Sequence, residues 1–166
     1  VTAGRKESSQ CAVLVTPDGE RSFAYMDGAS WNLTAQDITT NSLKSARMIV
    51  SEIYMYGFGQ NSEVAKCVFE CVQEHKIPHI MKIMDQDFGR HYAQKIHALV
   101  DAGIITTLIG NHFNLPYLFG TKGIDDTIEK LKTLKCDSVL THNREGAYYV
   151  FKDYVHHQPV KAVEHP

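Results

Sequence analysis

Two short apolar runs separated by a polar turn open the chain. Residues 11–15 (CAVLV) meet the turn Thr16-Pro17-Asp18-Gly19, and a second run covers residues 21–25. Proline presets φ and glycine accepts positive φ, so two strands around such a turn form a β-hairpin. The pattern predicts a hairpin that ends on the small residues Gly28-Ala29-Ser30 and projects from the main sheet.

Beyond residue 30 the apolar positions alternate between helical and strand-like spacing. Helical spacing covers residues 35–46, 61–75, 90–102 and 124–134, and strand-like runs cover 48–57, 80–84, 104–109 and 137–140. Residues 147–151 and 154–157 read as a second hairpin at one edge of the sheet. This order is typical of βαβ units and predicts one α/β domain, with a mostly parallel sheet covered by helices on both faces.

Composition excludes several classes of protein. The 166 residues are 43% hydrophobic, enough for one sizeable core, and the net charge of −2 shows no basic excess that would attract nucleic acid. No apolar run reaches the roughly 20 residues needed to span a bilayer, and the polar start lacks a signal peptide. We therefore expect a cytoplasmic protein that binds neither nucleic acid nor membranes. The cysteines are interpreted as buried free thiols rather than half of a metal site, although Cys67 and Cys71 share a helical face.

Polar residues follow the predicted strands, where ligands bind in sheets of this kind. These loops cover residues 57–59, 85–89, 110–114 and 141–146. Asp85 fits either a metal or phosphate site or the N-cap of the next helix, and its spacing favours the cap. Arg90 and His91 are predicted to begin that helix, where an anion would meet free backbone N–H groups. The other loops read equally well as turns, and no catalytic triad or zinc motif is legible.

Five segments in sequence order carry a family resemblance. They are CAVLVTPDGERSFAYMDGAS, EIYMYGF, MDQDFGRH, LIGNHFNLPYLFGT and LTHNREGAYYVFKDYVHHQPVKAVEHP. The first resembles a lid segment, the fourth an Asn-x-x-Glu motif and the fifth a Thr-x-Gly-x-x-Gly turn before a hairpin. Together they are similar to the ribokinase-like (PfkB) family of carbohydrate and nucleoside kinases, and most of all to its adenosine-kinase-like members.

The resemblance implies an ATP-dependent phosphotransferase that acts on a hydroxyl of a sugar or nucleoside and uses Mg²⁺. It implies a ribokinase-like three-layer α/β fold with a mostly parallel sheet and a β-hairpin lid. Residues 1–30 would form the lid segment and residues 31–166 a nucleotide-binding core, incomplete at both ends. Some relatives dimerise through their lids, so a homodimer is also expected. The implied site residues are Asn111, Asn114, Thr141 and Gly146 for the nucleotide, Asp85 and Arg90 for the phosphates, and Cys11, Val13, Tyr25, Gly28 and Ala29 for the lid.

Several departures from the family pattern affect the expected activity. Asn114 stands where the family has an acid that organises water around Mg²⁺, and Asn143 stands for a glycine. Asn143 tolerates left-handed φ, so the turn should survive. The family's Gly-Gly substrate motif and its catalytic Gly-Ala-Gly-Asp motif have no counterpart in the 166 residues.

Whether the chain is an enzyme therefore stays open at this point, with no catalytic residue or metal ligand assigned. We expect the chain taken alone to be inactive and to bind ATP weakly. Two alternatives remain: a non-catalytic nucleotide-binding relative, and an interaction domain whose hairpins pair with a partner's strands.

Overall fold

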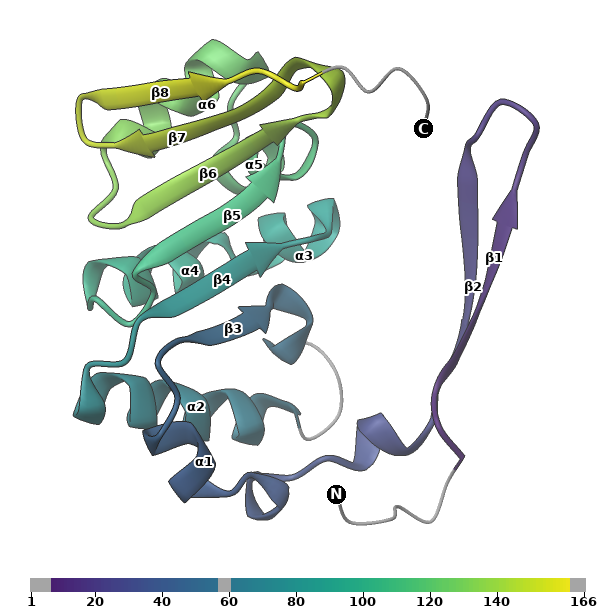
Figure 1. Cartoon of the computed structure of the whole chain (residues 1–166). Helices are drawn as coiled ribbons and strands as arrows, with labels where there is room; N and C mark the ends of the chain where they lie inside the picture. Colours follow the sequence, from purple (N-terminus) through teal and green to yellow (C-terminus); the bar gives the residue numbers. More distant parts are fainter. Residues whose placement is uncertain (1–6, 57–60, 162–166) are drawn as a thin grey trace.

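The computed structural model describes residues 7–56 and 61–161 and contains two sheets (Figure 1). An antiparallel hairpin joins β1 (Gln10–Val15) and β2 (Arg21–Met26). The main sheet has six strands in the order β3-β4-β5-β6-β7-β8. Its parallel strands are β3 (Ile49–Glu52), β4 (His79–Ile83), β5 (Thr107–Asn111) and β6 (Asp137–His142), and the antiparallel additions are β7 (Gly146–Phe151) and β8 (Tyr154–Gln158). The predicted α/β fold and the edge hairpin are confirmed.

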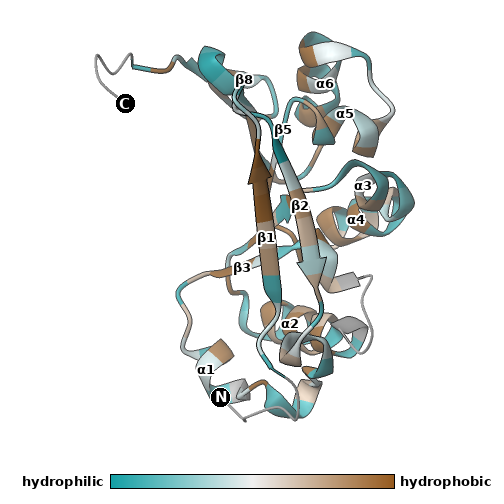
Figure 2. Ribbon diagram, turned by 90° about the vertical axis from the view of Figure 1, so that its right-hand side faces the viewer, coloured by the Kyte–Doolittle hydropathy of each residue, from teal (hydrophilic) through white to brown (hydrophobic). Residues whose placement is uncertain are grey.

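The helices that connect the parallel strands pack on one face of this sheet, as the edge-on view in Figure 2 shows. They are α2 (Asn61–His75), α3 (Gln86–His91), α4 (Ala93–Asp101), α5 (Asn114–Phe119) and α6 (Gly123–Lys132), while the short α1 (Thr40–Lys44) precedes β3. The strand order follows the sequence from β3 to β6. Right-handed crossovers in such an order place every connecting helix on the same side. The helices that connect β3 to β6 therefore lie on one face, whereas helices on both faces were expected.

The core lies between the sheet and these helices. Its fully buried side chains include Met81, Leu108 and Leu140 from the sheet. His79 is also fully buried, and its Nδ1 donates to the carbonyl oxygen of Ile104 at 3.0 Å while its Nε2 lies 2.6 Å from the Ser51 hydroxyl. Burial lowers the pKa of His79, which favours the neutral imidazole. Both ring nitrogens have partners, which makes this histidine part of the core.

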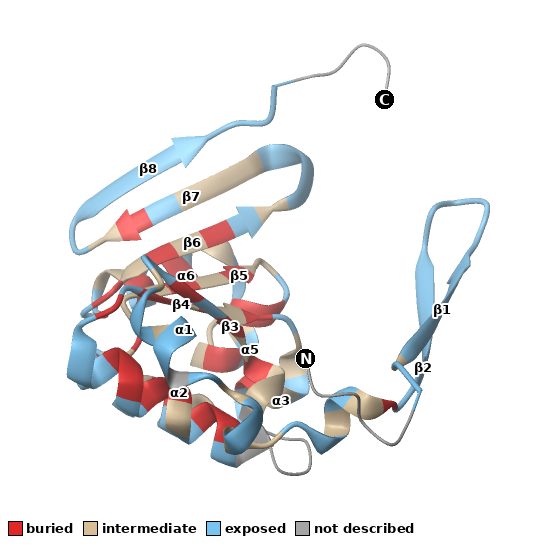
Figure 3. Cartoon of the chain, turned by 60° about the horizontal axis from the view of Figure 1, so that its bottom comes forward, coloured by how far each residue is buried: buried red, intermediate tan, exposed pale blue. Residues whose placement is uncertain are grey.

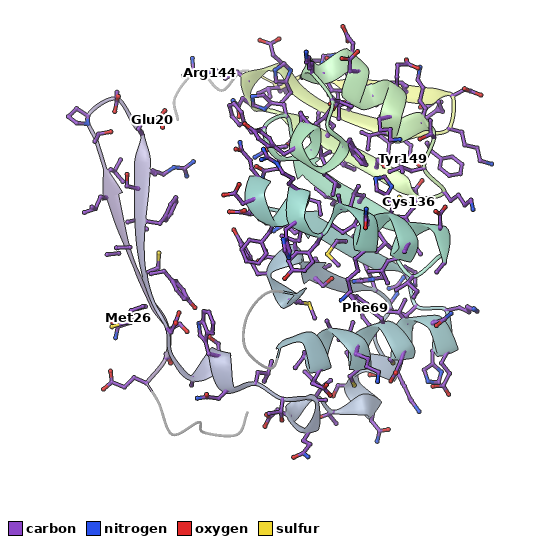
Figure 4. The ribbon with its side chains drawn as sticks, turned by 180° about the vertical axis from the view of Figure 1, so that it is seen from behind. Glu20, Met26, Phe69, Cys136, Arg144 and Tyr149 are labelled. Carbon is purple, nitrogen blue, oxygen red and sulfur yellow. The ribbon has the colours of Figure 1, made fainter. Side chains whose placement is uncertain are left out.

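The first hairpin stands away from the sheet, as predicted. Every residue of β1 and β2 is exposed (Figure 3). Figure 4 shows Glu20 near its tip and Met26 near its base, both remote from Cys136 and Tyr149 of the main body. At the base, a Cβ on Gly28 would lie 2.2 Å from the backbone nitrogen of Ser9, and the Ala29 N–H donates to the Glu7 carbonyl oxygen. Only glycine permits this close approach of two backbone segments.

Several element boundaries differ from the prediction. The strand predicted over 48–57 ends at Glu52 and continues as a 3₁₀ helix, Ile53–Tyr56. The helix predicted over 35–46 is reduced to α1 and a 3₁₀ turn, Ala35–Asp37. The helix predicted over 90–102 is two helices that meet at Tyr92.

Two further differences follow from local hydrogen bonding and proline chemistry. The strand predicted over 104–109 begins later, because the N–H groups of Ile104 and Ile105 both donate to Leu99 and close the end of α4. Helix α5 was not predicted, since it is short and contains a proline. Pro116 lies in its first turn, where no helical N–H bond is lost.

Candidate functional site

The carboxyl ends of β3 to β6 meet at one edge of the sheet and face the first hairpin (Figure 1). A cleft of about 820 Å³ lies between the hairpin and the end of β3. We call it the hairpin cleft. It is lined by Cys11, Phe23, Tyr25, Asp27, Ser30, Trp31, Glu52 and Tyr54.

One face of the hairpin forms a wall of this cleft. Cys11 pairs with Tyr25 across the two strands, and Val13 pairs with Phe23. Cross-strand partners lie on the same face of a sheet, so Val13 shares the face that the cleft residues occupy. Of the predicted lid residues, Cys11 and Tyr25 line the cleft. Cys11 is exposed, so the prediction of a buried thiol was wrong for this cysteine, because the hairpin is not covered by the core.

The predicted lid residues Gly28 and Ala29 hold the base of the hairpin and do not line the cleft. Nearby, the Ser9 and Ser30 hydroxyls lie 2.6 Å apart. Both hydroxyls also contact the Tyr25 phenol and lower its pKa, against an opposing effect of the Asp27 carboxylate. The base is therefore a small polar network that orients Tyr25.

Tyr54 joins the cleft to the loop after β4. Its ring packs edge-on against Phe88 of α3, with centroids 5.4 Å apart. Burial raises the pKa of Tyr54, and the nearby carboxylates of Asp85 and Glu52 raise it further. Glu52 accepts a hydrogen bond from Lys82 Nζ at 3.0 Å. The Asp85 carboxylate is thus near enough to act on Tyr54, which lines the hairpin cleft.

The structure separates the roles predicted for the segment after β4. Asp85 Oδ1 accepts a hydrogen bond from the Phe88 N–H at 2.9 Å, so the N-cap interpretation is confirmed. Arg90 and His91 occupy the last turn of α3, so the prediction that they begin a helix was wrong. A helix end presents carbonyl groups, which do not attract anions. The Arg90 guanidinium instead lies 5.1 Å from the centre of the Tyr117 ring.

The side-chain amides of Asn111 and Asn114 form hydrogen bonds with nearby backbone groups. Asn111 Oδ1 accepts from the N–H groups of Phe113 and Asn114, at 3.0 and 2.7 Å. Asn114 is only 7% exposed, and its Nδ2 donates to the Ile83 carbonyl oxygen at 3.2 Å. Mg²⁺ requires oxygen ligands, preferably charged ones. This pair therefore does not fit a Mg²⁺ site, and the two amides instead connect α5 to β4.

The turn after β6 contains two residues with positive φ, Asn143 and Gly146. Asn143 has φ +43°, so it adopts the left-handed conformation as predicted. Gly146 has φ +106°, and a Cβ there would lie 2.0 Å from the Gln158 carbonyl oxygen of β8. Thr141 is exposed, and its carbonyl oxygen accepts from the His112 N–H at 2.9 Å. The loops after β5 and β6 are thereby joined.

Sequence reasoning missed two features of this edge. The His112 and His142 rings lie 4.6 Å apart, and the buried Nδ1 atom of each has no hydrogen-bond partner among the described residues. Burial and the neighbouring His142 lower the pKa of His112, which favours its neutral form. The second feature is the aromatic lining of the cleft, which includes Trp31 and Tyr54. The density of aromatic residues on both sides of Gly28 was the available signal.

The described residues were also searched for a metal site and for a helix that could cross a membrane. Within residues 7–56 and 61–161 no three histidine, cysteine or acidic side chains form a group that could hold a metal ion. Cys71 and Cys136 are buried, and burial raises the pKa of Cys136 to about 11. In the same part of the chain, none of the helices has the length and apolar character required to cross a membrane. The predicted loop at 57–59 lies outside the described residues.

Comparison with known proteins identifies the family. The family model described as pfkB family carbohydrate kinase matches residues 1–165. The chain belongs to this family. Comparison with curated proteins gives no match to this sequence.

Solved structures share the fold at low sequence identity. Adenosine kinase from Sinorhizobium meliloti is 20% identical with a TM-score of 0.86, and the match covers 94% of this chain and 48% of that one. Anopheles gambiae adenosine kinase, in complex with P1,P4-di(adenosine-5) tetraphosphate, is 18% identical with a TM-score of 0.78, over 97% and 51%. An E. coli protein described as a ribokinase II, in complex with ATP and Mg²⁺, is 15% identical with a TM-score of 0.70, over 93% and 51%. The chain spans about half the length of these proteins.

Proposed function

We propose that this chain supplies the lid and a nucleotide-facing part of a kinase that transfers a phosphoryl group from ATP to a hydroxyl of a sugar or nucleoside. The observation that carries the proposal is the position of Tyr54, which lies in the hairpin cleft and also beside Asp85 and Phe88 of the next loop. An acceptor in the cleft would therefore border the edge where the family resemblance puts the phosphates. Membership of the family and the fold of the two adenosine kinases support this assignment.

The geometry suits a reaction that depends on positioning. Phosphoryl transfer requires the acceptor and the phosphates to be held in line, with water excluded. The hairpin would cover the acceptor, while Thr141, with its exposed position at the end of β6, would contact the nucleotide. Gly146 would shape the turn beside it. Because Asn111 and Asn114 do not fit a Mg²⁺ site, we assign no step to a metal held by them.

A calorimetric titration with ATP in the presence of Mg²⁺ tests this proposal. We expect weak binding, in about the millimolar range, and at least a roughly fivefold loss for Thr141→Val, which removes one hydroxyl without changing the size of the side chain. Thr107→Val is the matched control, because Thr107 lies at the opposite end of β5. Unchanged ATP affinity in Thr141→Val, or the same loss in Thr107→Val, would contradict the proposed nucleotide position.

A non-catalytic nucleotide-binding role is the second candidate, and one observation favours it. Asn114 stands where the resemblance implies an acid, and its amide is buried against the Ile83 carbonyl oxygen. The two candidates differ in turnover. ATP consumption by this chain with adenosine, ribose or fructose as acceptor would exclude the non-catalytic role, whereas ATP binding without consumption fits both candidates.

A further inference from the structure

Two histidines at the carboxyl edge of the sheet join two neighbouring loops. His112 directly follows β5 and His142 ends β6, and these strands pair in parallel with Asn111 opposite Thr141. The two imidazole rings lie 4.6 Å apart, with 55° between their planes. The His112 N–H also donates to the Thr141 carbonyl oxygen at 2.9 Å. We call the ring pair together with this hydrogen bond the histidine contact.

The two rings are packed in a way that suits their neutral form. The Nδ1 atom of each is buried and has no hydrogen-bond partner among residues 7–56 and 61–161. A neutral imidazole has one nitrogen without a proton, whereas an imidazolium donates from both nitrogens. Protonation would therefore leave a buried N–H group without an acceptor. A charge on one ring also disfavours a charge on the other at this separation.

The surrounding groups do not offset these costs. The ionisable residues of the adjoining turn, of α5 and of β7 and β8 include Arg144, Glu145, Tyr117, Tyr148 and His157. The first two are exposed, and Figure 4 shows Arg144 at the edge of the main body that faces the first hairpin. Tyr117 lies against the Arg90 guanidinium, and the Tyr148 ring stacks on His157. In the described part of the chain, neither histidine of the contact forms an ion pair with a carboxylate.

We propose that the histidine contact is a pH-sensitive junction, which is closed while His112 is neutral and which opens when His112 is protonated beside His142. Opening releases the turn that carries Thr141. The junction itself does not depend on the proposed kinase function. Its effect on nucleotide binding does rest on that function, because Thr141 is the residue proposed to contact ATP.

The direction of the pH dependence follows from burial. Burial and the His142 charge lower the pKa of His112 from its ordinary value of 6.5, although the Thr141 carbonyl oxygen opposes this shift in part. The folded chain therefore binds fewer protons at this site than the unfolded chain. The stability that the contact contributes is present above pH 6.5 and is lost as the pH falls through the lower pKa of the folded chain.

Hydrogen exchange at the His112 amide tests the proposal, because this N–H donates across the contact. Its protection factor, which corrects for the intrinsic effect of pH on exchange, is measured by NMR at about pH 7.5 and about pH 5.5. We expect it to fall about fivefold or more at the lower pH in the wild-type chain, and less than about twofold in His112→Gln. Global unfolding would not isolate the contact, since burial also lowers the pKa values of His79 and His97.

Two further variants complete this test. His142→Gln removes only the neighbouring charge and should show a smaller pH effect than the wild-type chain. His75→Gln is the matched control and should behave as the wild-type chain, because His75 ends α2 at the amino end of the parallel strands. Equal protection of the His112 amide at the two pH values in the wild-type chain would overturn the inference. So would an undiminished pH effect in His112→Gln or in His142→Gln.

ATP titrations at the same two pH values separate this inference from the proposed function. If Thr141 contacts ATP, opening of the junction should weaken ATP binding at the lower pH more in the wild-type chain than in His112→Gln. Comparison of the two chains cancels the protonation of ATP itself. Loss of His112 protection without this difference in ATP binding would refute the nucleotide position of Thr141 and leave the pH-sensitive junction standing.

Discussion

Asn114 shows how a single side chain can carry either a functional or a structural meaning. In sequence it reads as a neutral replacement in a Mg²⁺-linked motif. In the folded chain its amide is buried and donates to the carbonyl oxygen of Ile83, so it connects α5 to the end of β4. An amide provides the N–H that this contact needs and a carboxylate does not. The substitution is therefore coupled to local packing and not only to metal binding.

Asn114→Glu should destabilise the chain rather than restore Mg²⁺-dependent activity. The longer carboxylate would lose the hydrogen bond to Ile83 and place a buried charge beside a carbonyl oxygen. We expect a loss of about 3 kcal/mol in the free energy of unfolding. Urea denaturation followed by circular dichroism measures it. Asn41→Glu, an exposed position in α1, is the control and should change stability by less than about 0.5 kcal/mol. An equally stable Asn114→Glu chain would contradict the structural role.

At the scale of elements, the turn between β6 and β7 depends on contact with a third strand. The turn residue Asn143 and the glycine Gly146 both have positive φ, and Gly146 also lies against the backbone of β8. The first hairpin has a different arrangement. Its turn glycine, Gly19, has φ +85° but no atom close to the position of a Cβ. Substitutions at these two glycines therefore distinguish the energetic cost of a positive φ from the cost of crowding around a Cβ.

Gly146→Ala and Gly19→Ala form a matched pair for this comparison. Alanine at Gly19 costs the strain of positive φ alone, about 1 kcal/mol. Alanine at Gly146 adds a clash with the Gln158 carbonyl oxygen and should cost about 3 kcal/mol, because β8 must shift. Chemical denaturation of both variants measures the difference. Equal losses would show that β8 yields without cost and would contradict the crowding argument.

At the scale of the whole molecule, the residues that form the core and the residues proposed to cover a ligand lie in different parts, the main sheet with its helices and the first hairpin. The core comprises side chains of β3 to β7 and the helices on one sheet face, and it contains no residue of the first hairpin. The hairpin strands instead keep apolar side chains exposed (Figure 2). Residues that do not contribute to the core remain available for a ligand or for closure over one, as a lid requires.

Two leucine substitutions test this division. Leu108 in β5 is fully buried and Leu14 in β1 is 64% exposed. Leu108→Ala should lower the free energy of unfolding by about 2–5 kcal/mol, because it leaves a cavity in the core. Leu14→Ala should change it by less than about 0.5 kcal/mol. A large loss of stability in Leu14→Ala would show that the hairpin packs on the main body in solution, contrary to the exposed position described above.

Much of the fold was readable from the sequence because it is encoded over short distances. The Pro-Asp-Gly turn determined the hairpin, the helical spacing of residues 61–75 determined α2, and the position of Asp85 predicted its cap on α3. The predicted element boundaries that were wrong depend on contacts with residues outside the segment concerned. The late start of β5 is one example, because the N–H groups of Ile104 and Ile105 donate to the Leu99 carbonyl oxygen of α4.

The candidate site was only partly predictable, because it depends on which loops the fold brings together. Local patterns specified the strands, the turns and the family motifs, since each needs only neighbours within a few residues. Tertiary structure decided that the helices lie on one face, because that follows from the strand order. It also placed Trp31 and Tyr54 in one cleft and buried the Asn114 amide against Ile83. Those contacts join segments far apart in the chain, and no local pattern of hydrophobic and polar residues specifies them.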